Sequence, residues 1–177
     1  MRRLTLTPLC GLLIAGLTAA APKGAAAADD KKPDPAALAR TRKTVHTLDD
    51  VYKTTIVMIT DKYVKDKQSY PAGRAAILMF RDISGHGSHE VRLIDVSGEP
   101  DNARNIAKDD FEKKGVEQLK AGKDYYEQVV YKEGKPYLRA MTAVPVVMDK
   151  CILCHENYKK AKKGEAVGAL SYTVPIE

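Results

Sequence analysis

The sequence has no tryptophan, only two phenylalanines and only three cysteines among its 177 residues. One of the cysteines, Cys10, lies inside an apolar N-terminal stretch, so removal of that stretch would leave Cys151 and Cys154 alone. A disulfide between two cysteines this close together closes a very small loop and constrains the unfolded chain little. The shortage of cysteine therefore excludes a domain held by a disulfide framework, and it indicates that Cys151 and Cys154 serve chemistry.

A strong net charge is also missing. The chain has 29 basic and 23 acidic residues, a formal charge of +6. Loss of residues 1–28 removes Arg2, Arg3 and Lys23 and no acid, which leaves 26 basic against 23 acidic residues, or +3. No basic helix and no aromatic stacking platform is visible, so we expect no nucleic-acid partner. The length and the lack of internal repeats favour one domain.

The N-terminus has the pattern of a secretory signal peptide. Arg2 and Arg3 form a basic region, residues 4–21 form an apolar run, and the alanines of residues 25–28 offer a cleavage site. We therefore predict a signal peptide at residues 1–28 and a periplasmic or otherwise exported protein. An uncleaved signal acting as an anchor is the alternative, and it would be the chain's only contact with a membrane.

After the signal, residues 29–35 (DDKKPDP) are expected to form a flexible lead-in, and residues 36–177 a single domain. Residues 36–65 contain no proline or glycine, and apolar residues recur there at helical spacing, which predicts a long helix. Val51 and Met58 flank the main apolar stripe of this helix on one side, and His46 and Val57 flank it on the other. We therefore expect the helix to lie between two neighbours.

The remaining pattern predicts an α+β domain. We expect helices at 72–81 and 110–121, the latter opened by a capping box of Asp109 and Glu112, and strands near 89–96, 125–131, 136–144 and 166–174. The turns between these strands are short, which implies an antiparallel sheet, and we expect the helices on one side or end of it.

Cys151-Ile-Leu-Cys154-His155 is a C-x-x-C-H motif. Its two thiols are spaced to reach the two vinyl groups of a haem, and the adjacent histidine can rise to the iron. The motif therefore predicts one covalently bound haem c, with His155 as the proximal axial ligand. The apolar residues 143–148 run directly into the motif and can wall the haem.

Other uses of the two cysteines remain open. A structural zinc site needs four ligands, and only His46, His86 and His89 are available to complete one. A thioredoxin-type redox pair follows the first strand of a βαβ unit, and no such unit is visible here. A non-haem binding module with a Cys151–Cys154 disulfide is a third alternative.

The sequence does not identify the sixth ligand of the iron. Methionine or histidine there would give an electron carrier or redox sensor, and an open position would admit a small gas or peroxide. Met58 is our first choice, because it lies off the main stripe of the long helix, and His46 comes next. The other candidates are His86, His89, Met141 and Met148.

The chain resembles a family of bacterial exported c-type haem domains with a PAS-like fold. Members occur as stand-alone periplasmic proteins or as sensor modules of histidine kinases and chemoreceptors. The resemblance spans residues 45–177. It rests on the long first helix, GEPDNARN at 98–105 leading into DFE at 110–112, YLRA at 137–140, the haem motif, and the tail at 164–175.

The resemblance implies an antiparallel sheet with a long N-terminal helix and a C-terminal haem-binding segment. It implies that Cys151 and Cys154 hold the haem, that His155 is the proximal ligand, and that the first helix supplies a distal ligand of variable type. We therefore expect a mono-haem c-type cytochrome that senses redox state or a small ligand, or transfers electrons, with a redox or signalling protein as partner. A small haem peroxidase using His46 or Arg139 is the enzymatic alternative.

Overall fold

The computed structural model describes residues 32–177, apart from the side chain of Cys154, so the predicted signal peptide lies outside the described residues. Helix α1 (Pro35–Tyr63) is the long helix expected from the apolar pattern. Its start is fixed by Asp34, whose carboxylate accepts hydrogen bonds from the backbone N–H groups of Ala36 (3.3 Å) and Ala37 (3.0 Å). Within residues 32–177, no helix combines the length and the apolar character that crossing a membrane requires.

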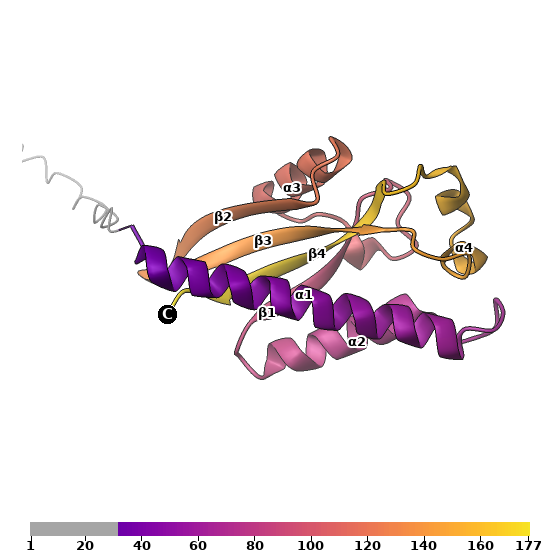
Figure 1. The fold of residues 1–177 in the computed structure, drawn as a ribbon, viewed down its shortest axis with the longest axis horizontal. Coiled ribbons are helices and arrows are strands. Elements are labelled where there is room, and N and C mark those ends of the chain that lie inside the picture. The colour runs from indigo at the N-terminus through magenta and orange to yellow at the C-terminus, as the bar shows by residue number, and fades with distance from the viewer. Residues whose placement is uncertain (1–31) are drawn as a thin grey trace, which may run out of the picture.

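Four strands form one antiparallel sheet in the order β1-β4-β3-β2 (Figure 1). They are β1 (Glu90–Asp95), β2 (Tyr125–Lys132), β3 (Lys135–Pro145) and β4 (Ala166–Pro175). The β2–β3 hairpin turns at Glu133 (φ 52°) and Gly134 (φ 75°). Positive φ at both central residues matches the right-handed twist of the flanking strands, and glycine adopts it without a steric penalty. The predicted α+β class with an antiparallel sheet is confirmed.

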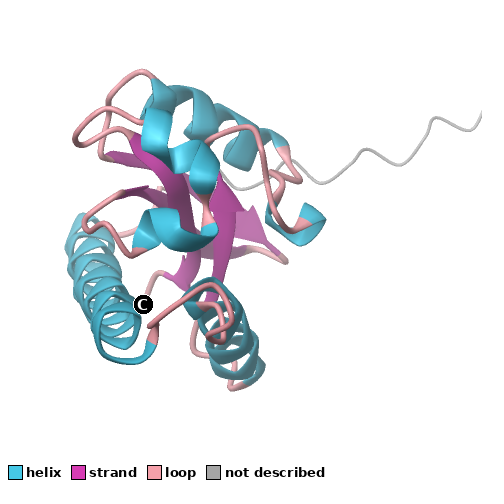
Figure 2. Ribbon diagram, turned by 90° about the vertical axis from the view of Figure 1, so that its right-hand side faces the viewer, coloured by secondary structure: helices cyan, strands magenta, loops and turns pink. Residues whose placement is uncertain are grey.

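Helices cover both faces of the sheet. Helix α1 and helix α2 (Ala72–Gly85) pack on one face, and helix α3 (Asp110–Lys120) packs on the other (Figure 2). The expectation that the helices gather on one side or end is therefore wrong. The physical reason is that the strands are apolar on both faces, so each face needs a cover. Short helical turns complete the chain: η1 (Ala103–Asn105), α4 (Cys151–Cys154) and η2 (Glu156–Lys160).

Strand alternation divides the core in two. On the α1–α2 face, buried residues from the strands and helices pack together: Leu138, Leu170, Tyr172, Val45, Tyr52 and Phe80. On the α3 face the buried cluster comprises Ile94, Met141, Ala169, Phe111 and Leu119. Successive side chains of a strand point to opposite faces, so β1, β3 and β4 each contribute to both clusters.

The Val51–Met58 side of helix α1 is exposed. Val51 is 54% exposed and Met58 is 56% exposed, whereas Val45 and Tyr52 are buried against the sheet. Helix α1 contacts two neighbours, the sheet and α2, but its Val51–Met58 side faces neither of them. Exposed apolar side chains of this kind are common on protein surfaces and do not imply a partner.

The start of α3 contains a buried charge. Asp109 caps the helix, because its Oδ1 accepts from the Glu112 N–H at 2.9 Å. The Glu112 carboxylate, only 1% exposed, turns inward to the Arg92 guanidinium (2.6 Å) and accepts from the Lys108 N–H (2.8 Å). The Asp109 half of the predicted capping box is confirmed, but the Glu112 carboxylate accepts from the N–H of Lys108 rather than that of Asp109 and serves as a buried ion-pair partner.

We expect Glu112→Ala to lower the free energy of unfolding by about 3 kcal/mol, because removing one partner of a buried pair leaves the other charge uncompensated. Urea denaturation followed by circular dichroism measures the change. Glu117→Ala is the matched control on the exposed side of the same helix, where the pair with Lys114 is worth less than about 1 kcal/mol. Equal losses in the two variants would contradict a special role for Glu112.

Candidate functional site

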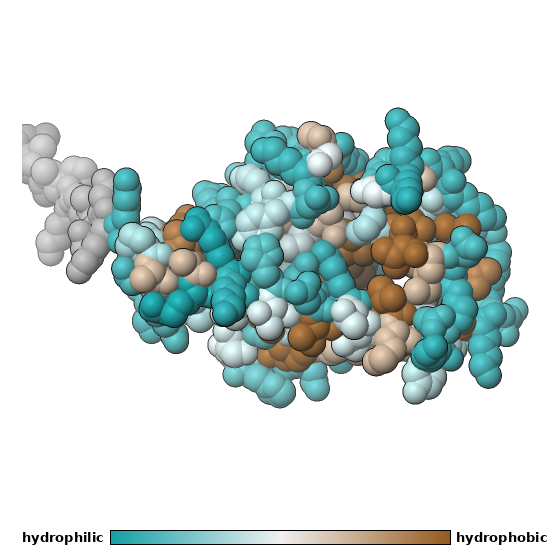
Figure 3. All heavy atoms as spheres, in the orientation of Figure 1, coloured by the Kyte–Doolittle hydropathy of each residue, from teal (hydrophilic) through white to brown (hydrophobic). Residues whose placement is uncertain are grey.

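A cavity of about 1070 Å³ lies at one end of the sheet. Figure 3 shows hydrophobic side chains gathered around a hollow at this end of the molecule. Its walls come from the C-terminal half of α1, the N-terminal half of α2, the ends of β1 and β3, the start of β4 and the chain that follows β3. Apolar residues from several elements face it: Ile56, Val57, Ala76, Leu93, Val144, Leu153 and Leu170. Ligand pockets of proteins span about 300–1,000 Å³, so this one is large.

The segment of residues 146–165, which we call the strap, leaves β3 after Pro145 and returns to β4. It contains α4 and η2 and closes one side of the cavity. Two contacts fasten it to the end of α1 and the chain beyond: Lys150 Nζ donates to the Asp61 carbonyl, and Lys67 Nζ lies 2.7 Å from Glu156 Oε1.

The strap places two residues of the C-x-x-C-H motif on the cavity wall. Cys151 opens α4, is half-buried and has a free thiol, and it lines the cavity together with His155. Cys154 ends α4, one residue before His155. Cys151 and His155, four positions apart in the sequence, thus reach a single cavity through one short helical turn.

The His155 imidazole is held from one side. Its Nδ1 lies 2.5 Å from Asp101 Oδ2, and its ring stacks on Tyr158 with centroids 4.6 Å apart. Burial raises the pKa of Tyr158 to about 12, so its hydroxyl stays neutral beside these groups. When a carboxylate accepts a hydrogen bond from the Nδ1–H of a neutral histidine, Nε2 keeps its lone pair. This is the usual arrangement of a metal-binding histidine.

Asp101 lies in a loop that is fixed at both ends. At the start, Asp95 accepts from the Ser97 hydroxyl (2.6 Å) and from the N–H of Gly98 (2.7 Å), where φ is +91°. At the end, Arg92 Nη2 donates to the carbonyl of Arg104 at 2.8 Å. The sequence predicted a loop here and gave Asp101 no role, because its partner lies 54 positions away and no local pattern joins them.

The two residues predicted as distal ligands lie away from this cavity. Met58 is exposed, and His46 stacks on Tyr125 with ring centroids 5.2 Å apart; neither lines the cavity. The residues of α1 that do line it near this level are Val57 and Thr60. One position along a helix turns the side chain by about 100°, so Met58 falls outside the sector that Val57 occupies.

Of the other candidates only Met148 lines the cavity. His86 is exposed, and Met141 is buried in the α3-side core. The His89 Nε2 lies 2.6 Å from the Tyr52 hydroxyl, and burial lowers the pKa of His89. Arg139, the second acid–base group of the peroxidase alternative, pairs with Asp109 at 2.7 Å on the α3 face.

The wall built by α1 and α2 contains no histidine, methionine or cysteine. Among the described residues its members are Lys53, Ile56, Val57, Thr60, Ala72, Gly73, Arg74, Ala76, Ile77 and Leu78. Lys53 Nζ lies 2.8 Å from Asp49 Oδ2, and the same carboxylate accepts from the hydroxyls of Thr142 (2.5 Å) and Tyr172 (3.0 Å). The wall is thus mostly apolar, and its two cationic groups are the Lys53 ammonium, held by a carboxylate, and the Arg74 guanidinium.

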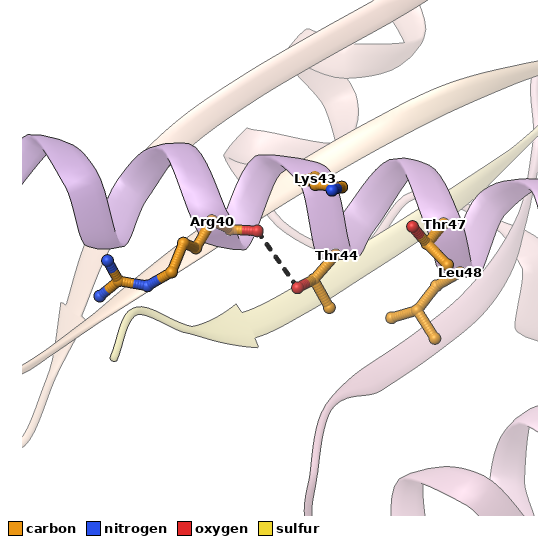
Figure 4. Close-up of a pocket in the computed structure, with 5 residues that line it drawn as sticks. All are labelled: Arg40, Lys43, Thr44, Thr47 and Leu48. Atoms are coloured by element: carbon orange, nitrogen blue, oxygen red, sulfur yellow. Dashed lines mark hydrogen bonds between the residues drawn. The ribbon is translucent and has the colours of Figure 1, made fainter.

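A second hollow of about 350 Å³ lies along α1 (Figure 4). All five residues that line it belong to that helix, from Arg40 to Leu48, and the hydrogen bond drawn there joins the Thr44 hydroxyl to the Arg40 carbonyl. Ligand sites draw polar groups from several elements, and this hollow does not.

Among the described side chains of the chain, no three of the His, Cys, Asp and Glu type are grouped to hold a metal ion, so the zinc alternative finds no ligand set among them.

The Asp101–His155 contact predicts the tautomer of the imidazole. In the isolated chain, at a pH where the ring is neutral, we expect the proton of His155 on Nδ1. A hydrogen bond to a carboxylate is worth about 1.5–3 kcal/mol, so Asp101→Ala should shift the tautomer ratio roughly ten- to hundredfold towards Nε2–H, as read from ¹⁵N NMR shifts. Glu99→Ala, on the same loop, is the control. An unchanged tautomer in Asp101→Ala would contradict the assignment.

Comparison with known proteins places the fold. A search of curated proteins found no match. Among solved structures, the chain is similar to the crystal structure of the cyanobacterial haem protein Tll0287, with a TM-score of 0.53 and 12% identity over 80% of this chain and 96% of that one. At this identity the likeness shows the fold alone. The model of the Tll0287-like family matches residues 32–175, and the chain therefore belongs to the Tll0287-like family.

Proposed function

We propose that this protein carries one haem c in the cavity, attached through Cys151 and Cys154 and ligated by His155. The observation that carries the proposal is the position of Cys151 and His155 on one cavity wall, with the histidine Nδ1 on Asp101. The C-x-x-C-H spacing supports it, since that spacing suits covalent haem attachment. The haem content of the related Tll0287 structure supports it further.

The residues of the cavity fit a haem. The volume of about 1070 Å³ and the aliphatic lining suit a large planar apolar group, and the basic rim suits its acidic edge. When bound, the haem would supply one-electron redox chemistry and an iron that takes axial ligands. The protein's part is to orient His155 through Asp101 and to exclude water with side chains such as Leu93, Val144 and Leu170.

Export is part of the proposal. It rests on residues 1–28, and it agrees with attachment of haem c on the exported side of the membrane. The expected PAS-like relation also belongs to the proposal, with the antiparallel sheet and long first helix as its support. We assign no enzymatic role, because His46 and Arg139, the acid–base groups of the peroxidase alternative, do not line the cavity.

The wall chemistry favours a ligand-sensing cytochrome over a simple electron carrier. The α1–α2 wall carries no histidine, methionine or cysteine among the described residues, so that side would leave the sixth position to a small exogenous ligand. A redox or signalling protein would read the change. Electron transfer remains the second function, and Met148, which lines the cavity from the strap, is the observation in its favour.

Covalent haem is tested first. The protein should be expressed for export in a host that matures c-type cytochromes, extracted with acid–acetone and examined as the pyridine haemochrome. We expect retained colour with the α-band of thioether-linked haem, and loss of that colour in the Cys151→Ala/Cys154→Ala double variant. Cys10→Ser, outside the motif, is the control and should change nothing. Colour that extracts from the wild type, or never forms, would refute the proposal.

The sixth position is tested with carbon monoxide. We expect the reduced protein to bind carbon monoxide, with a shift of its Soret band, and Met148→Leu to bind it with affinity within about threefold of the wild type. Met58→Leu, at an exposed position, is the matched control. A wild type that ignores carbon monoxide and a Met148→Leu variant that binds it would instead favour methionine ligation and electron transfer.

A further inference from the structure

The cavity wall has an excess of positive charge. Five basic side chains line it, namely Lys53, Lys67, Arg74, Arg104 and Lys150, against three acidic ones, namely Asp95, Asp101 and Glu156, a difference of +2. A wall with this charge suits a ligand that carries two negative charges beside a large apolar body. Haem has that composition, since two propionates project from its porphyrin edge.

Three of the five cations are already paired with acids. Lys53 lies 2.8 Å from Asp49, and Lys67 lies 2.7 Å from Glu156. Lys150 lies 3.7 Å from Asp61 and also donates to its carbonyl. These three ammonium groups are engaged within the protein itself, so they contribute little free positive charge to a ligand.

The acids of the wall are engaged as well. Asp101 holds His155, and Asp95 accepts from Ser97 and from the N–H of Gly98. Their oxygens are therefore occupied by groups of the loop and the strap. Asp95 and Asp101 would therefore repel a ligand carboxylate only weakly, and the cations without partners would attract it.

Arg74 and Arg104 are those free cations. Among the described residues, neither guanidinium has a hydrogen-bond or ion-pair partner, although both line the cavity and both are exposed. Their segments, α2 and η1, each contact β1, the edge strand of the sheet. The Arg74 and Arg104 guanidinium groups thus belong to separate elements, and both line the cavity on its β1 side.

We propose that Arg74 and Arg104 bind the two propionates of the haem. A guanidinium pairs with a carboxylate through two parallel N–H···O bonds, which suits it better than an ammonium for this contact. The vinyl and propionate pairs lie on opposite edges of the porphyrin. It is consistent with this that the cysteines come from the strap and the arginines from other elements. The inference rests on the proposed function and adds the residues that orient the haem in its plane.

The test uses the matured haem protein and measures its reduction potential across pH. A cation beside the haem destabilises the ferric form more than the ferrous form, because the ferric form carries one more positive charge. Removing the cation therefore stabilises the ferric form, and the reduction potential falls. We expect Arg74→Gln/Arg104→Gln to shift the reduction equilibrium about tenfold towards the ferric form, about 59 mV for one electron. Arg74→Lys/Arg104→Lys, which keeps both charges, should recover most of the shift.

A second readout separates this role from general surface charge. Loss of the arginines raises the pKa of the propionates, so the pH-dependent step of the potential should move to higher pH. Arg81→Gln, exposed on α2 and outside the cavity, is the matched control and should leave the step in place. Thermal unfolding of each variant shows whether the fold is intact.

The outcomes are distinguishable. A double variant that matches Arg81→Gln in potential and in pH step overturns the propionate assignment, while covalent haem and the proposed function stand. A wild type without covalent haem overturns the proposed function itself before any arginine is changed. A fall in potential with a displaced pH step in the double variant alone supports both.

Discussion

The buried Arg92–Glu112 ion pair links the helical layer of α3 to the loop that holds His155. Glu112 belongs to the first turn of α3, and Arg92 reaches it from β1 with Nη1 while donating with Nη2 to the carbonyl of Arg104. Asp101 lies on the same loop and holds the imidazole. A buried pair adds little net stability, but its geometry is strongly constrained because each charge needs its partner. The pair therefore helps to fix one end of the loop whose Asp101 contacts His155.

The cavity lies where the sheet stops. Pro145 lacks the N–H that a ladder needs, and the register between β3 and β4 shifts at Val144, so the chain leaves the sheet there as the strap. Gly168 pairs with Val144 of β3 and with Asp95 of β1, and a Cβ on it would lie 3.4 Å from the Ile94 carbonyl. Because Gly168 has no side chain and β3 leaves the sheet after Pro145, a space remains at this end of the sheet. Apolar side chains line this space without filling it.

Local pattern predicted the elements well, and tertiary contacts account for what it missed. Helical spacing located α1, and alternation located all four strands, because each pattern repeats over neighbouring residues. The C-x-x-C-H motif is also local. The direction of the Met58 side chain was misjudged, because an apolar stripe on a helix does not show which side of the helix faces a cavity. Asp101 was missed because its contact with His155 joins two segments that are distant in the sequence. Whether α3 covered the second sheet face depended on the sheet being apolar on both sides.

Lys53 carries the only side-chain nitrogen with which α1 lines the cavity, so its state determines whether α1 can supply a nitrogen ligand to a metal. An ammonium has three donors and no lone pair, so a lysine that donates to Asp49 is not a metal ligand. That carboxylate is itself held by Thr142 and Tyr172, and burial and the Asp49 charge raise the pKa of the Tyr172 hydroxyl, which keeps it a donor. Freeing the lysine would leave a carboxylate at the sheet with one hydrogen-bonding partner fewer and no countercharge. The network thus keeps the Lys53 nitrogen from acting as a metal ligand, and in the proposed haem site Met148 or a molecule from outside would take the sixth position.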